Sequence, residues 1–441
     1  MQKFSFILFS CCVFLSSPVF AAGFYIQEQS VSGQGAAFAG AGADARDASI
    51  IFYNPAGITA LQRTTASIET SLIIPRASFS NLGSTAGLTA GAQGAYAGND
   101  GGNPFSPTAV PAFYAALPVD TEKRYWMGLN VTSSFGLSNK YGTGWFGRYD
   151  STSSNLQDID ISPVFAAKLD NHLSVGGGVN IQHVNVTLKS ALPCPNVGFG
   201  CGAAFSSASD GASSLKGDSW AAGFNAGVLW QPQQATRIGA SYRSVVTHDV
   251  KGDVTITGLS GALAGENGVQ GASARLDLPN IIGLSIAQDM NERLTFLGSY
   301  NWFGWNRFRE IRVRFDDGAP DNVTPEGYKN SYALALGAEW KQTDALTFRT
   351  GVQYDKTPTT DEERNTRVPD ADRYWLSLGA SYALNNNFSV DVAATHIFMK
   401  NSDINLSDEI YGGTAADTTN LVKGSSQNMI NIVSLQINGK F

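Results

Sequence analysis

The feature that most constrains this chain is a period-two alternation of apolar residues with small or polar ones, which returns along most of its length. Between residues 220 and 230, Trp220, Phe224, Val228 and Trp230 share one parity, while the other parity is mostly Gly, Ala and Asn. Successive side chains of a β-strand point to opposite faces, so this pattern predicts a strand with one apolar face. The same alternation fills residues 331–340, 346–354 and 374–382. The chain is therefore predicted to be all-β.

The connections between the predicted strands alternate in length. Segments between them number fourteen, and an even number places both ends of a closed barrel on the same side. Short turns on one side and long loops on the other are typical of an outer-membrane β-barrel. A soluble β-sandwich or propeller, which alternation alone also allows, has no reason for this asymmetry. The short connections are 119–123, 170–172, 231–234, 289–292, 342–345 and 385–387; the long ones lie near 80–108, 138–156, 191–216, 251–273, 308–328, 356–370 and 401–426.

Aromatic spacing and composition favour the membrane barrel. Trp220 and Trp230 lie on one face, and ten residues at ~3.3 Å each, tilted by ~40°, cover roughly the ~25 Å apolar band between two aromatic girdles. Charged residues make up only 15% of the chain, which is low for a soluble domain. After residue 21, no run of 18 or more apolar residues occurs, so no transmembrane helix is predicted. We predict a 14-stranded antiparallel transmembrane β-barrel over residues 63–441.

The first 21 residues have the pattern of a signal peptide. A basic start, an apolar run over residues 4–15 and the small residues Val19 and Ala21 predict cleavage before Ala22. A lipoprotein signal using Cys11 is the alternative, disfavoured because the apolar run before it is short and Phe9 is bulky. The protein is thus exported, and with a net charge of −7 it is not expected to bind nucleic acid.

Residues 22–62 are too rich in Gly and Ala, and too poor in large apolar residues, to build a core of their own. Near the end of this stretch, Asn54-Pro55-Ala56 is a favourable start for a short helix, with Asn as the cap and Pro at the first position. The stretch predicts a plug, or hatch, wound through the barrel lumen, with a flexible arm as the alternative. Its clustered charges, Asp44, Arg46 and Asp47, are then expected to pair with polar groups lining the lumen.

Two strands depart from simple alternation. Ser134-Phe135-Gly136 carries a glycine inside a strand, which indicates a kink or bend. Between residues 173 and 188, apolar residues occupy odd positions through Ile181 and even positions from Val184, which predicts a bulge near Gln182–His183. An ordinary barrel bulge is the alternative to a functional role for either.

Little in the sequence indicates catalysis or metal binding. Cys194 and Cys201 lie in an exported, Gly- and Pro-rich loop and are expected to form one local disulfide. No G-x-S-x-G turn is present, so we expect no enzyme, cofactor or metal. An outer-membrane lipid hydrolase using His396 on the lipid side, or an open porin or adhesin, are the alternatives of another class.

Several motifs together resemble the FadL family of outer-membrane long-chain fatty-acid transporters, which also includes carriers of toluene and xylene. The resemblance covers essentially the whole mature chain, and its motifs are specific in combination. They are Ala22-Gly23-Phe24, Ser32-Gly33-x-Gly35, Asn54-Pro55-Ala56 and the stretches 220–227, 347–351 and 369–377.

The resemblance implies passive transport of a hydrophobic ligand, with long-chain fatty acids favoured and aromatic hydrocarbons as the alternative. The ligand would be captured among the outer loops, move to an apolar pocket and leave laterally through the barrel wall at a kinked third strand, here Ser134-Phe135-Gly136. Lys329, in Gly327-Tyr328-Lys329-Asn330, matches the position of a lysine that holds the carboxylate. The family's arginine position falls near Ser190, with Lys189 beside it. Arg148, in an aromatic setting, is a further candidate ligand.

The predicted barrel and the family resemblance also indicate where the protein is located and what it contacts. The protein is expected in the outer membrane of a Gram-negative bacterium, as a monomer in contact with the lipid bilayer and lipopolysaccharide. The last strand ends in Phe441, and a terminal aromatic residue resembles the signal read by the barrel-assembly machinery.

Overall fold

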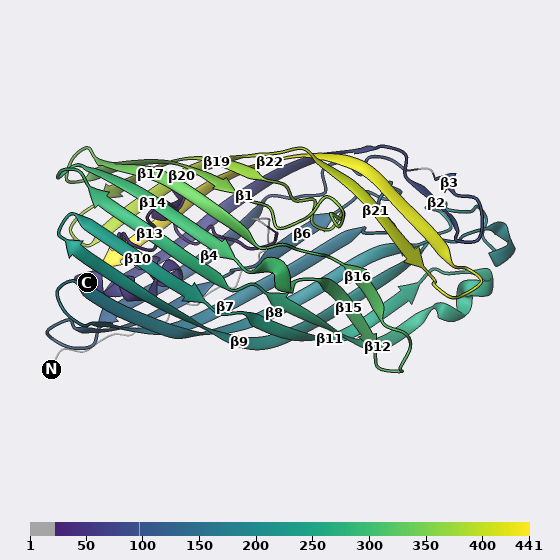
Figure 1. The fold of residues 1–441 in the computed structure, drawn as a ribbon, viewed down its shortest axis with the longest axis horizontal. Coiled ribbons are helices and arrows are strands. Elements are labelled where there is room, and N and C mark those ends of the chain that lie inside the picture. The colour runs from purple at the N-terminus through teal and green to yellow at the C-terminus, as the bar shows by residue number, and fades with distance from the viewer. Residues whose placement is uncertain (1–22, 97) are drawn as a thin grey trace.

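The computed structural model describes residues 23–96 and 98–441, so the predicted signal peptide lies outside the described residues (Figure 1). Strands dominate, and the helices are short, with three to six residues each. Over the described residues, no helix has the length and hydropathy needed to cross a bilayer. The elements are α1 (Val31–Gln34), α2 (Ile50–Tyr53), η1 (Pro55–Ala60), β1 (Thr65–Asn81), β2 (Thr85–Leu88), β3 (Gly94–Ala95), β4 (Thr108–Pro118), β5 (Tyr125–Thr132), β6 (Gly136–Lys140), β7 (Ser153–Lys168), β8 (Leu173–Leu192), η2 (Val197–Phe199), β9 (Gly211–Gln233), β10 (Thr236–Arg243), β11 (Val246–Thr257), η3 (Gly261–Glu266), β12 (Gly268–Leu278), β13 (Ile281–Asp289), β14 (Leu294–Phe303), η4 (Trp305–Arg307), β15 (Glu310–Phe315), β16 (Asn322–Pro325), β17 (Ser331–Lys341), β18 (Leu346–Asp355), β19 (Arg373–Ala383), β20 (Phe388–Met399), β21 (Ser402–Ile410) and β22 (Thr418–Lys440).

These elements form a closed antiparallel barrel of fourteen strands over the described residues, as the sequence predicts. Strands β1, β4, β7, β8, β9, β18, β19 and β22 each cross in one piece. Six more crossings are made by two successive elements with a break between them: β5–β6, β10–β11, β12–β13, β14–β15, β16–β17 and β20–β21. The short strands β2 and β3 belong to an outer loop.

The first and last strands close the barrel. Thr65 pairs with Lys440 and the ladder runs without a shift to Asn81 and Gly424. Both ends of the barrel therefore lie at the end with the short turns (Figure 1). Because outer-membrane barrels keep short turns on the periplasmic side, the long loops at the opposite end face outward.

The outer face is apolar between two rows of aromatic rings. On β17, the outward-facing Leu334 and Leu336 are 49% and 61% exposed. Tyr332 stands above them and stacks near Tyr300 on β14, with ring centroids 6.2 Å apart. Below them, Trp340 lies 6.3 Å from the ring of Phe348 on β18. An exposed apolar band between aromatic rows is what a barrel shows to lipid.

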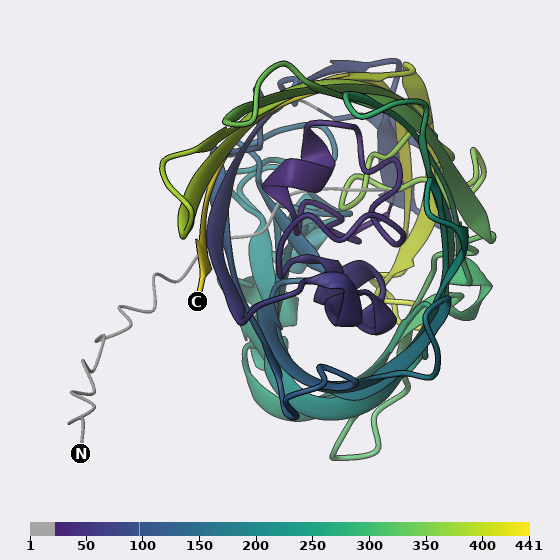
Figure 2. The ribbon, with the colours of Figure 1, turned by 90° about the vertical axis from the view of Figure 1, so that its left-hand side faces the viewer.

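The N-terminal segment, residues 23–62, lies inside the ring of strands (Figure 2). Asn54 caps η1 by accepting a hydrogen bond from the Ala56 N–H at 3.1 Å. Its amide also donates to the Gly42 carbonyl at 2.7 Å and to the Val228 carbonyl of β9 at 2.9 Å. A Cβ at Gly239 would lie 1.9 Å from the Gly42 oxygen, so a glycine in the wall lets the two backbones meet.

Charged side chains tie the segment to the wall. Arg46 bonds Asp44 at 3.0 Å and Glu339 of β17 at 2.8 Å. Glu339 also accepts a hydrogen bond from Arg349 of β18 at 2.6 Å. Asp47 accepts one from the Ser32 hydroxyl at 2.6 Å. The three clustered charges of this segment, Asp44, Arg46 and Asp47, therefore each have a polar partner, which offsets the cost of burying them.

The bulge predicted near Gln182–His183 is wrong. The ladder between β8 and β9 runs from Leu173 to Leu192 without a register shift. The apolar parity changes because the surroundings change. Val179 and Ile181 face outward and are 48% and 40% exposed, whereas Val186 and Leu188, on the other parity, line an internal cavity.

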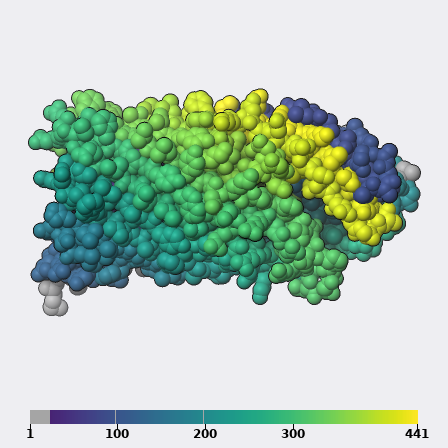
Figure 3. Space-filling view, in the orientation of Figure 1, coloured from purple at the N-terminus to yellow at the C-terminus, as the bar shows by residue number. Residues whose placement is uncertain are grey.

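The outer loops pack on one another at the far end of the barrel (Figure 3). Strand β2 pairs with β22 from Thr85 with Leu421 onward. Cys194 and Cys201 form a disulfide, with Cα atoms 5.9 Å apart.

Candidate functional site

An apolar cavity lies inside the barrel, between the N-terminal segment and the outer loops. Hydrophobic side chains make up most of its lining, as in sites that hold small hydrophobic molecules. Inward-facing aliphatic side chains of β6, β7, β8, β9, β11 and β12 form most of its wall. They are Leu137, Leu156, Val186, Leu188, Leu215, Val250, Ala274 and Leu276, joined by Phe24 from the N-terminal segment, Ile311 from β15, and Phe308 and Val368 from loops.

Two inward-lying ionisable side chains share this cavity, Arg367 and Glu326. Arg367 belongs to the loop between β18 and β19, and its guanidinium donates to the Asp150 carbonyl at 2.6 Å and to the Ser154 hydroxyl at 3.3 Å. Within the part of the chain that the structure describes, no carboxylate lies within ion-pair distance of it. Arg367 therefore brings a positive charge that neutral oxygens hold in place.

Glu326 is 2% exposed and lies between β16 and β17. Its Oε1 accepts a hydrogen bond from the Asn365 amide at 3.0 Å, while its Oε2 has no partner among the described residues. Burial, and next the charge of Asp150, raise the pKa of Glu326 to about 8. At neutral pH this group is a carboxylic acid with a hydroxyl free to donate a hydrogen bond.

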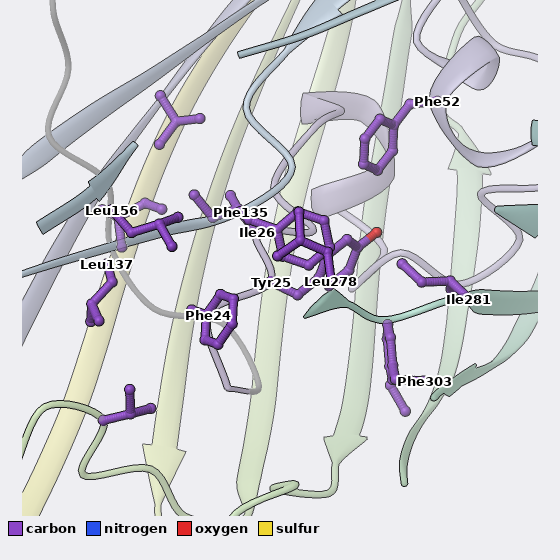
Figure 4. Close-up of a cluster of buried hydrophobic side chains, with 14 of the residues drawn as sticks. Phe24, Tyr25, Ile26, Phe52, Phe135, Leu137, Leu156, Leu278, Ile281 and Phe303 are labelled. Atoms are coloured by element: carbon purple, nitrogen blue, oxygen red, sulfur yellow. The ribbon is translucent and has the colours of Figure 1, made fainter. Parts of the chain in front are cut away.

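The N-terminal segment touches both this cavity and the break between β5 and β6, which together form the third strand of the barrel. Phe24 lines the cavity, and its ring lies 4.7 Å from Trp305 and 5.3 Å from Phe308. The next residue, Tyr25, forms an antiparallel bridge with Phe135. Figure 4 shows Phe24 and Tyr25 beside Phe135, with Leu137 and Leu156 close by.

Between β5 and β6, three residues bulge into the lumen. Thr132 pairs with Asp160 and Gly136 with Gln157, so three residues on this strand oppose two on β7. On the other side, the ladder between β4 and β5 ends at Phe113 and Val131. The wall therefore lacks strand pairing beside residues 133–135.

The Asp158 carboxylate supports the bulge by accepting hydrogen bonds from the Ser134 N–H at 3.0 Å and the Phe135 N–H at 3.3 Å. Gly136 resumes the strand. The residues singled out by the sequence as a kink, Ser134-Phe135-Gly136, thus lie at this interruption.

The basic residues that the sequence proposed as ligands do not line the cavity. Lys329 is exposed, and its backbone N–H donates to the Pro358 carbonyl at 2.9 Å. Lys189 is exposed on β8, on the same parity as the outward-facing Ile181. Arg148 is 2% exposed and bonds the Asp210 carboxylate at 2.7 Å, with the rings of Tyr96 and Tyr149 against its guanidinium.

No pattern in the sequence pointed to Arg367 or Glu326 as residues of the site. Both lie in stretches predicted as long loops, where alternation carries no information, and their positions depend on contacts made from far along the chain. Asn139, for example, donates to the Arg367 carbonyl at 2.7 Å. One signal was available, because the parity change after Ile181 marks where a strand begins to face an apolar interior.

His396 lies on the outer face of β20. Its Nδ1 is 2.7 Å from the Asn431 amide oxygen, and its ring is 4.2 Å from that of Phe398. Among the described residues, no serine hydroxyl or carboxylate is hydrogen-bonded to it, and no three Asp, Glu, His or Cys side chains gather as metal ligands would.

A fourteen-stranded barrel with a lipid-facing band and an apolar internal cavity defines an outer-membrane protein of the class that transports small hydrophobic molecules. The chain belongs to the family described as outer membrane protein transport protein (OMPP1/FadL/TodX), whose model matches residues 12–441. It is located in the outer membrane of a Gram-negative bacterium.

Three similar proteins illustrate the family. A long-chain fatty acid transport protein of Escherichia coli O6:H1 is 30% identical over 405 residues, covering 87% of this chain and 88% of that protein. A 47 kDa outer membrane protein of Pasteurella multocida is 29% identical, covering 89% and 90%. The crystal structure of a Pseudomonas aeruginosa FadL homologue has a TM-score of 0.85 at 24% identity, covering 95% of this chain and all of that one. At that identity, the structural likeness bears on the fold.

Proposed function

We propose that this protein carries long-chain fatty acids passively through the outer membrane, by way of the cavity beside Arg367 and Glu326. The observation that carries the proposal is an aliphatic cavity with one arginine that has no carboxylate partner. An acyl chain fits the aliphatic wall, and a carboxylate would receive hydrogen bonds from the guanidinium and from the neutral Glu326. The name of the Escherichia coli relative supports the same substrate class.

The proposed route has three parts. Residues 23–62 act as a plug that keeps the lumen closed to ions. The ligand rests on Phe24, which lines the cavity. When the N-terminal segment withdraws from Phe135, the ligand leaves sideways between β4 and residues 133–135, where strand pairing is missing. Lateral exit keeps the acyl chain out of water, which saves its hydrophobic transfer cost.

Uptake of labelled oleate tests the proposal, in cells that lack their own carrier and express this protein or a variant. Arg367→Ala is expected to weaken uptake at limiting oleate by roughly tenfold, since a hydrogen bond to a charged group is worth about 1.5–3 kcal/mol. Lys329→Ala is the matched control, since it removes an exposed positive charge outside the cavity. Loss of oleate uptake with Lys329→Ala, and no loss with Arg367→Ala, would identify Lys329 as the residue that binds the carboxylate. No oleate uptake above control cells would refute the proposal.

Labelled toluene serves as the second ligand. Solved structures of toluene and monoaromatic hydrocarbon channels share this fold, and an aliphatic cavity accepts a neutral ring. Toluene uptake that is indifferent to Arg367→Ala, with no uptake of oleate, would identify an aromatic hydrocarbon carrier instead.

A further inference from the structure

The barrel wall is also broken at a second place, between β12 and β14–β15. The ladder from β12 to β15 covers only Ala272 to Ala274. Pairing resumes at the Gly304 N–H, which donates to the Asn280 carbonyl at 2.9 Å. Between these points, residues 275–279 face residues 305–312, and within the described residues no strand pairing joins the two stretches. We call this interval the wall break.

The wall break exists because residues 305–309 fold inward and bond to another loop. The Glu326 and Gly327 N–H groups donate to the Arg309 carbonyl at 2.7 and 2.9 Å, and the Tyr328 N–H donates to the Phe308 carbonyl at 3.2 Å. Backbone groups that would otherwise extend the ladder are thus satisfied without β12. Trp305 and Phe308 are buried by the same turn, at 0% and 5% exposure.

The wall break borders the apolar cavity directly. Leu276 and Ile311, from its two sides, both line the cavity. Arg275 does so as well, although it alternates with the inward-facing Leu276 and its side chain is 63% exposed. Because Leu276 faces inward and its neighbour Arg275 faces outward, the cavity lies next to the outer surface at this point of the wall.

The position of the wall break relative to the membrane follows from the exposed residues of the adjoining strand β13. On β13, the outward-facing Ile282, Leu284 and Ile286 are 41–50% exposed and belong to the lipid-facing band. The next outward positions toward the loops are Asp277 and Arg275, which form an ion pair at 3.1 Å. A change from apolar to charged residues marks the upper edge of the hydrocarbon region, so the wall break lies at the outer lipid–water interface.

Positively charged side chains predominate around the wall break. Besides Arg275, the exposed Arg307 and Arg309 belong to the stretch that borders the wall break. Among the described residues, neither of these two has a carboxylate within ion-pair distance. Glu310 and Arg312 of the same stretch form an ion pair with each other at 2.7 Å, which leaves Arg275, Arg307 and Arg309 against Asp277 and favours an anionic head group at this rim.

We propose that the wall break is a side entrance, through which a single-chain carboxylic acid passes from the outer lipid–water interface into the apolar cavity. The three arginines attract the carboxylate, and the acyl chain follows between Leu276 and Ile311. This rests on the proposed function, to which it adds a point of entry separate from the exit beside residues 133–135.

Thiol labelling in intact cells tests the entrance, using the full-length protein with its native disulfide. Ile311→Cys and Val186→Cys each place one reactive thiol on the cavity wall; Val186 sits where β8 pairs on both sides, with Leu156 and Gly217. A water-soluble, thiol-reactive polyethylene glycol is expected to modify Ile311→Cys about tenfold faster, because the thiol behind the intact ladder must wait for local opening. Excess oleate should slow the reaction at Ile311→Cys.

A transport measurement completes the test. Modified Ile311→Cys is expected to lose most of its oleate uptake, while Leu82→Cys, modified in an exposed outer loop, keeps it. Leu276→Cys replaces Ile311→Cys if that variant does not reach the outer membrane. Equal labelling rates, or full uptake after modification at Ile311→Cys, would overturn the side entrance while leaving the fatty-acid proposal intact. Fast labelling of Ile311→Cys that oleate slows, without any oleate uptake, would overturn the fatty-acid transport proposal and leave the side entrance intact.

Discussion

Tyr25 and Phe135 form an antiparallel bridge inside the barrel, with ring centroids 5.4 Å apart. On either side of it, the Ile26 N–H donates to the Ser134 carbonyl and the Gly136 N–H donates to the Phe24 carbonyl, both at 2.8 Å. The N-terminal segment thus satisfies backbone groups that the bulge of the third strand withdraws from the wall. This backbone contact therefore connects Phe24, which lines the cavity, to the interruption between β5 and β6.

Deletion of Ser134 should close the proposed lateral exit. It removes the one residue by which this strand exceeds β7, so the ladder can continue from Thr132 to Gly136. We expect a folded barrel whose oleate uptake falls to the level of cells without the carrier. Ser134→Ala, which keeps the length, is expected to retain uptake. Normal uptake by the deletion variant would mean that ligand does not leave here.

Binding of oleate should weaken above about pH 8 because of Glu326. Burial raises its pKa to about 8, so it is a neutral hydrogen-bond donor below that pH and a second negative charge beside the ligand above it. The affinity of purified protein in lipid nanodiscs, measured by displacement of a fluorescent fatty acid, should fall between pH 7 and pH 9. Glu326→Gln stays neutral and should show a flatter profile. Parallel profiles for both proteins would exclude Glu326 as the cause.

The strands, the turns and the Asn54 cap follow from local patterns, so the sequence is enough to predict them. Alternation reports only which face is apolar, not whether that face meets lipid or a cavity. This is why Val184 and Val186 suggested a bulge, although they continue a regular strand that has risen above the lipid band. Arg367 is held by Asp150 and Ser154, which lie more than two hundred residues earlier. No local pattern encodes such contacts, and basic residues chosen by motif, such as Lys329, lie outside the cavity.

Asn54→Ala should loosen the N-terminal segment without unfolding the barrel. The substitution removes the side-chain donor to the Gly42 and Val228 carbonyls and the cap of η1. The expected cost is about 1–3 kcal/mol of local stability. Hydrogen exchange should become faster in residues 31–61 and stay unchanged in β8 and β9. Gln62→Ala, at an exposed residue, is the control, and unchanged exchange in both variants would contradict the role given to Asn54.

Deletion of residues 23–43 should open the lumen to ions. These residues are all buried inside the barrel, yet the ladder that closes it, from Thr65 with Lys440 onward, does not include them. Because the barrel's backbone bonds lie within the wall, we expect a folded product that migrates as a compact barrel before heating and conducts ions in planar bilayers far better than the intact protein. An unfolded product would mean that the segment is needed for folding. Unchanged conductance in a folded barrel would mean that the outer loops, such as those carrying Arg367 and Glu326, close the lumen without it.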